Sequence, residues 1–109
     1  MNKLRVAIAQ LNTTVGDIAG NKSKIMSYIE QSDKKQSDII IFPELTITGY
    51  PPEDLLFRKD FIQANMNALN EIVEFSKNRD MLIVIGFVDS DIYLYNAAAI
   101  IYSAVSYTH

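Results

Sequence analysis

Residues 38–44 read Asp-Ile-Ile-Ile-Phe-Pro-Glu, and this stretch decides the fold class of the chain. Its four consecutive apolar residues, with no polar residue between them, predict a strand covered on both faces, as in parallel sheets. Pro43 fixes its own φ angle and keeps Phe42 extended, so the strand ends in a stiff segment. Glu44 therefore follows the carboxyl end of a buried strand, the edge at which open α/β sheets bind ligands.

The sequence before this strand predicts one strand and one helix. Residues 4–10 are rich in branched and small apolar side chains, which favour a buried strand. Asp17 is placed to cap the first turn of a helix that should run to about Lys34. The buried face of that helix would consist of apolar residues at spacings of seven and four: Ile18, Ile25 and Ile29.

The sequence after the strand predicts a long loop and a second helix. The loop extends to about Lys59 and includes one helical turn at residues 53–57. Asp60 is placed to cap the helix, and Gln63 is placed to reach back in a capping box. The buried face of this helix would consist of apolar residues three or four apart: Ile62, Met66, Leu69 and Val73.

Two further strands complete the pattern. Residues 81–87 predict a third strand, and a fourth runs from about Tyr93 to Tyr102. Strands that alternate with helices predict a parallel sheet with right-handed crossovers. The last two strands are joined too tightly for a crossover helix, so they should form an antiparallel hairpin. The fold class is therefore α/β, with a mixed sheet and two helices.

Composition and charge exclude several classes of partner. The 109 residues fit one small domain, and ten Lys and Arg are scattered among thirteen Asp and Glu, for a net charge of −3. Without a basic stripe, neither nucleic acid nor an anionic membrane surface is an expected partner. No apolar stretch approaches the roughly 20 residues that span a bilayer. The chain has no cysteine, and the default expectation is a cytoplasmic protein.

Glu44 is the first candidate for catalysis. Glu44 follows the end of a strand and a proline, so the backbone that carries its carboxylate has little conformational freedom. Apolar neighbours would remove part of its hydration and make it a better general base. On position alone, two other interpretations stay open: a solvated loop acid, or a carboxylate that caps nearby backbone.

Tyr50 is the second candidate, six residues beyond Glu44. It could line a substrate pocket, or it could pack the loop onto the sheet. Gly49 is expected to have a positive φ angle that turns the loop back over the site. The acids Glu53 and Asp54 favour the start of a helical turn rather than a metal site, because two carboxylates without further ligands hold a metal poorly.

A longer block around Glu44 carries a family resemblance. Residues 42–56 read Phe-Pro-Glu-Leu-Thr-Ile-Thr-Gly-Tyr-Pro-Pro-Glu-Asp-Leu-Leu. This block resembles the signature of the carbon–nitrogen hydrolase (nitrilase) superfamily, in which a strand delivers Pro-Glu-Leu and its glutamate. The extension in residues 49–56 is similar to the branch that forms the glutaminase domain of glutamine-dependent NAD synthetases. The resemblance runs from Leu4 to Tyr102.

The resemblance implies a fold for residues 1–102. They would form the N-terminal half of a nitrilase-like α-β-β-α sandwich, truncated before its second sheet. Residues 103–109 depart from the family pattern, and we expect a non-family tail that is an artefact of the reading frame. A half domain of this kind would leave an apolar sheet face uncovered, so we expect the chain to associate in water.

The resemblance also implies a Glu–Lys–Cys catalytic set that hydrolyses the amide of glutamine. Only Glu44, as general base, maps onto this chain, and Tyr50 matches an aromatic residue of the substrate pocket. The positions of the lysine and the cysteine are absent, so the chain alone should be inactive. No cofactor or metal is expected in this segment. ATP and Mg²⁺ would serve a synthetase domain in the same full-length protein, which is expected to form a homo-oligomer.

Two alternatives remain at this stage. One is a fragment of a free-standing omega-amidase or carbamoyl-amine amidase of the same superfamily. The other belongs to a different class, a non-catalytic α/β binding module in which Glu44 is only structural. A downstream ATP-binding domain would favour the synthetase, whereas a chain that folds as a complete monomer would favour the binding module.

Overall fold

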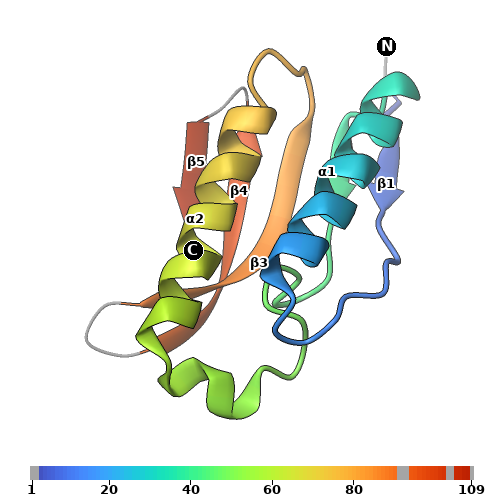
Figure 1. The fold of residues 1–109 in the computed structure, drawn as a ribbon. Coiled ribbons are helices and arrows are strands. Elements are labelled where there is room, and N and C mark those ends of the chain that lie inside the picture. Colours follow the sequence, from blue (N-terminus) through green and yellow to red (C-terminus); the bar gives the residue numbers. More distant parts are fainter. Residues whose placement is uncertain (1–2, 91–93, 103–104, 109) are drawn as a thin grey trace.

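The chain alternates strands and helices and forms one mixed sheet with both helices on the same face (Figure 1). The computed structural model describes residues 3–90, 94–102 and 105–108. The first three strands are parallel to one another, and the hairpin that follows is antiparallel, so the predicted α/β class and mixed sheet are confirmed. The strands lie in chain order across the sheet: β1 (Val6–Ile8), β2 (Ile39–Ile41), β3 (Leu82–Ser90), β4 (Leu94–Tyr102) and β5 (Val105–Thr108).

Helix α1 (Ile18–Lys34) has the bounds that the sequence predicts. The Oδ1 atom of Asp17 accepts a hydrogen bond of 3.0 Å from the backbone N–H of Gly20, which satisfies one of the free donors of the first turn. Ile25 and Ile29 are fully buried against the sheet. Local signals, a capping side chain and an apolar spacing, therefore suffice for this element.

Helix α2 (Lys59–Phe75) begins one residue before Asp60, so the predicted cap and capping box are wrong. Arg58 occupies the cap position with extended backbone angles and makes no side-chain cap bond. Asp60 instead accepts a hydrogen bond of 2.9 Å from Arg58, and that guanidinium lowers the pKa of the Asp60 carboxyl. Gln63 donates to Asn67 rather than reaching back. The carboxylate still lies in the first turn, where the helix dipole favours it.

The buried face of α2 is rotated by about one residue from the predicted one. Of the predicted set only Leu69 is buried, while Met66 and Val73 are partly buried and pack against the core. The difference arises because Asn65 takes a core position. Its side chain is buried and bonds both polar groups of the Val88 backbone in β3. The buried residues are Phe61, Asn65, Ala68, Leu69 and Ile72.

One face of the sheet is packed, and the other carries exposed apolar side chains. Successive side chains along a strand alternate between the faces, and those that face the helices are buried: Ile40, Ile83, Ile85, Phe87, Ala97, Ala99 and Ile101. We call the opposite face the open face; its exposed members include Val6, Ile8, Ile41 and Tyr102. Strand β2 was predicted to be covered on both faces, but within the described residues only one face is covered.

The strands at the C-terminal side are longer and more numerous than predicted. Strand β3 continues past Phe87 to Ser90, because it pairs with β4 along its whole length. Residues 105–108, which we expected to be a tail, form β5 and pair with β4 in the antiparallel sense. Val, Tyr and Thr favour strands and here find an open strand edge beside them. The predicted start of the fourth strand at Tyr93 lies outside the described residues.

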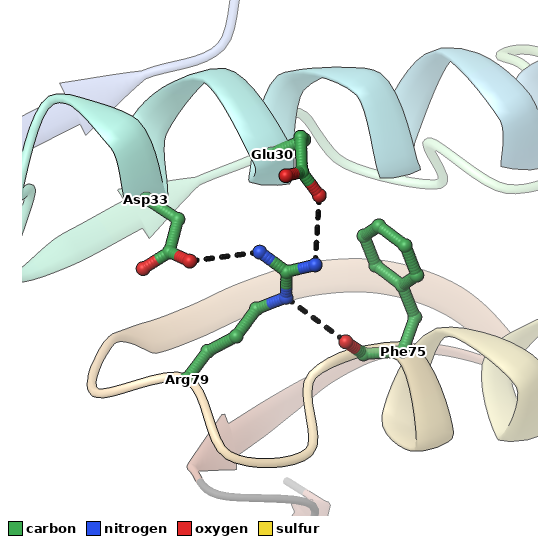
Figure 2. Close-up of polar contacts among 4 residues, drawn as sticks. All are labelled: Glu30, Asp33, Phe75 and Arg79. Atoms are coloured by element: carbon green, nitrogen blue, oxygen red, sulfur yellow. Dashed lines mark hydrogen bonds and ion pairs between the residues drawn. The ribbon is translucent and has the colours of Figure 1, made fainter.

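Arg79 joins the ends of the two helices (Figure 2). Its guanidinium donates to Asp33 and to Glu30 of α1, both at 2.8 Å, and its Nε donates to the carbonyl oxygen of Phe75 at 3.0 Å. The guanidinium also lies over the Phe75 ring, 4.4 Å from its centre. The side chain is only 17% exposed, so these ion pairs are partly shielded from water. The contacts fix α1 beside α2 on the packed face.

Candidate functional site

Glu44 lies where the chain leaves β2 and continues beside β3. Strand β2 has only three residues, whereas β3 has nine, so β3 has a free edge beyond the end of β2. The segment after β2 occupies this edge. The N–H of Phe42 donates to the carbonyl oxygen of Val84 at 2.9 Å, and the N–H of Ile47 donates to that of Gly86 at 3.5 Å. The turn between these two bonds, residues 43–47, carries Glu44.

Gly86 provides the space for this turn. A Cβ atom added to Gly86 would lie 2.4 Å from the backbone nitrogen of Leu45 and 3.1 Å from the Cα of Glu44. Its neighbours in β3, Ile85 and Phe87, face the helices, so the missing side chain of Gly86 would point to the open face. The Glu44–Leu45 backbone therefore crosses the open face directly over a glycine.

Residues 43–49 are further fixed by bonds within the turn. The hydroxyl of Thr46 donates to the carbonyl oxygen of Pro43, and the hydroxyl of Thr48 donates to that of Gly49 at 3.0 Å. The N–H of Gly49 donates to the carbonyl oxygen of Leu45 at 3.0 Å, and Leu45 itself has a φ of +50°. Both threonines are buried. The turn is thus a closed unit rather than a loose loop.

A second loop, residues 12–17, packs against this turn. The N–H of Gly16 donates to the carbonyl oxygen of Thr48 at 3.0 Å. Gly49 has the expected positive φ, +79°, and a Cβ atom there would lie 2.7 Å from the Cα of Val15. Glycine is therefore required at Gly49 both by its backbone angle and by the approach of the second loop.

Asn21 links the two loops from inside the protein. Its side chain is fully buried in α1. The Nδ2 group donates to the carbonyl oxygens of Thr14 at 2.9 Å and of Ile47 at 3.0 Å, and Oδ1 accepts from the N–H of Thr14 at 2.8 Å. One amide thus satisfies three backbone groups from two loops.

Glu44 lines a cleft of about 330 Å³ on the open face. The lining residues are Phe42, Pro43, Glu44, Val84, Gly86, Ala97 and Ala98. A carboxylate at the rim of such a cleft can take up or return a proton on a group bound there. The expected desolvation of Glu44 is not met among the described residues, because the side chain is exposed. The sheet lies on one side of the Glu44 side chain, and its other side faces solvent.

Tyr50 is not among the residues that line this cleft. It follows the turn that carries Glu44, and it is 65% exposed. Its assignment to the substrate pocket therefore stays a prediction. Within the part of the chain that the structure describes, no group of three or more His, Cys, Asp or Glu side chains could hold a metal ion. In the same residues no helix has the length and apolar character needed to cross a membrane.

Gly86 and Asn21 are the residues of this site that the sequence pattern did not identify. A glycine inside a strand pattern is a general sign that another backbone approaches closely. Similarly, Asn21 is a polar residue on the apolar side of a helix, four positions before Ile25. The glycine within the strand and the asparagine on the apolar side of the helix are both visible in the sequence. Neither shows which segment of the chain it contacts.

The sequence of this chain matches one known protein family over most of its length. A family model described as carbon–nitrogen hydrolase matches residues 5–106. The chain belongs to this family. The carbon–nitrogen hydrolase match includes β1 through β4, the turn with Glu44 and both helices.

The similar proteins are much longer than this carbon–nitrogen hydrolase chain. The glutamine-dependent NAD(+) synthetase of Thermotoga maritima is 42% identical over 101 residues, which are 93% of this chain and 18% of that protein. The solved glutamine-dependent NAD(+) synthetase of Cytophaga hutchinsonii superposes with a TM-score of 0.88 at 25% identity, over 94% of this chain and 18% of that one. The chain thus spans less than a fifth of the length of these relatives.

A more distant structure shares the fold alone. A mutant of the amidase from Nesterenkonia sp. AN1, with acrylamide added at its active site cysteine, superposes with a TM-score of 0.83 at 15% identity. The match covers 96% of this chain and 43% of that one. The sheet and helices described above therefore correspond to less than half of that amidase chain.

Proposed function

We propose that this chain is the first part of the glutamine-hydrolysing domain of a glutamine-dependent NAD synthetase. The observation that carries the proposal is the position of Glu44, fixed over Gly86 at the rim of a cleft on the open face. The similarity to the synthetases of Thermotoga maritima and Cytophaga hutchinsonii supports the choice of substrate. The complete protein would be a cytoplasmic homo-oligomer.

Glu44 acts as the general base in this proposal. Its carboxylate takes the proton from a cysteine thiol, and the thiolate attacks the side-chain amide carbon of glutamine. The carbon–nitrogen bond then breaks, ammonia leaves with the proton, and a thioester remains. Glu44 next takes a proton from water, which attacks the thioester and releases glutamate and the thiol. Tyr50 would contact the bound glutamine from the end of the turn.

The remaining groups of this chemistry come from outside the 109 residues. The chain contains no cysteine, so it is proposed to be inactive alone. A cysteine and an oxyanion-stabilising lysine from the rest of the domain would complete the cleft from the side of the open face. The ammonia would pass to a synthetase domain of the same protein, which uses ATP and Mg²⁺ to convert deamido-NAD into NAD.

The test compares two single substitutions in the complete protein that contains this chain. Glu44→Gln should lower kcat for glutamine hydrolysis by about 10²- to 10⁴-fold, the usual contribution of a general base. Glu53→Gln is the matched control, because it removes an exposed carboxylate from the same loop and should leave kcat unchanged. Equal activity of Glu44→Gln and the unaltered protein would refute the assigned role.

Free ammonia separates the synthetase from the alternatives. Glu44→Gln should still make NAD from deamido-NAD and ATP when ammonia replaces glutamine, because the synthetase domain is untouched. A protein that hydrolyses glutamine or another amide but never makes NAD would be a free-standing amidase. A protein with neither activity would be a non-catalytic module, and Glu44 would then be structural.

A further inference from the structure

Asn21 is the only fully buried side chain among the described residues that bonds both loops behind Glu44. The loop with Thr14 and the turn with Ile47 each present backbone groups to it, at 2.8–3.0 Å. A buried amide or carbonyl without a partner is costly, so these groups depend on Asn21 for their placement. Ile47 is three residues from Glu44, and its own N–H donates to the carbonyl oxygen of Gly86 in β3 at 3.5 Å.

The protein holds a second asparagine of the same kind elsewhere. Asn65 is also fully buried on a helix, and its amide donates to the carbonyl oxygen of Val88 at 2.6 Å while its oxygen accepts from the Val88 N–H at 3.1 Å. Asn65 therefore satisfies the backbone N–H and carbonyl groups of Val88, in the part of β3 beyond the turn. Its partners are Val88 in β3 and Ile62 in its own helix, so Asn65 has the same chemistry as Asn21 without a bond to Ile47 of the turn.

We propose that Asn21 is a positioning residue for Glu44, and that it acts through the carbonyl group of Ile47. The bond to Ile47 holds one end of the turn, while Gly86 admits the other end against β3. The bonds to Thr14 make the position of the turn depend on the neighbouring loop as well. Loss of the amide frees the turn to move, and a shift of about 1 Å in a catalytic group can cost on the order of 10²-fold in rate.

The experiment uses the complete protein and rests on the proposed glutaminase function. Asn21→Leu removes the amide at similar volume, and Asn65→Leu is its matched control. We expect Asn21→Leu to lower kcat for glutamine by about 10- to 100-fold, with KM within about twofold, measured well below the unfolding temperature. Asn65→Leu should unfold at a lower temperature too, but its kcat should stay within about twofold of the unaltered protein.

A conservative variant guards against loss of folding. Asn21→Asp keeps an oxygen that can accept from the Thr14 N–H but removes the donor to Ile47. If Asn21→Leu does not fold, Asn21→Asp should show the same loss of kcat. Equal kcat losses in the Asn21 and Asn65 variants, or no loss in either, would overturn the proposal and leave Asn21 a structural residue.

Crystal structures of the variants separate this inference from the proposed function. In Asn21→Leu or Asn21→Asp the Glu44 backbone should be displaced relative to the sheet, and in Asn65→Leu it should not be. This readout requires no activity. If the unaltered protein is inactive but Glu44 is displaced in the Asn21 variants, only the glutaminase proposal is refuted. If the unaltered protein is active and Glu44 does not move in the variants, only the positioning role is refuted.

Discussion

Gly86→Ala is the smallest change that should disturb the site, because it adds one carbon beneath Glu44. The added Cβ would lie 2.4 Å from the nitrogen of Leu45, and real contacts of this kind stay at 3.0 Å or more. The turn and β3 must therefore separate by about 0.6 Å (3.0 − 2.4) or more. The obstacle is backbone held by bonds on both sides, so a side-chain rotation cannot relieve it.

The expected cost of this separation has two parts. Inserting a methyl group into a packed site usually lowers the free energy of unfolding by about 1–3 kcal/mol. The displaced Glu44 should also lower kcat for glutamine by about 10- to 100-fold. Chemical denaturation of the complete protein measures the first quantity, and steady-state kinetics under folding conditions measures the second.

Ala68→Gly is the control for this substitution. It creates a glycine in the middle of α2, on the packed face, and should cost about 1 kcal/mol through helix propensity, more if a cavity forms. Its kcat should not change, because it leaves the turn over Gly86 in place. A Gly86→Ala protein with unchanged kcat and a free energy of unfolding within about 0.5 kcal/mol of the unaltered protein would refute the proposed clash.

Two further predictions concern packing. Arg79→Met should lower the free energy of unfolding by about 1–2 kcal/mol, since it breaks two partly shielded ion pairs, whereas Arg58→Met at an exposed pair should change it by less than about 0.5 kcal/mol in denaturation experiments. Equal effects of the two would contradict the assigned shielding. The 109-residue chain alone should associate through its open face, so light scattering after size exclusion should detect oligomers; Ile8→Lys, at an exposed position of that face, should reduce them. A monodisperse monomer with a cooperative thermal transition would refute this expectation.

Some parts of the fold follow from local sequence because their signals are local. Asp17 and the spacing of the isoleucines in α1 set that helix without reference to the rest of the chain. The apolar run before Pro43 likewise predicted β2 and the placement of Glu44 at its end. The predicted start of α2 at Asp60 was wrong, because Arg58 takes the cap position without a capping side-chain bond, so no local sequence signal marks it.

The sequence by itself therefore determined the α/β order, the bounds of α1 and the position of Glu44 at the carboxyl end of β2. Only the tertiary structure decided that the Glu44 backbone crosses over Gly86 and that Asn21 joins two loops. The physical reason is distance along the chain. Propensity and periodicity act over a few residues, whereas a Cβ clash or a buried amide bond joins segments that meet only after folding.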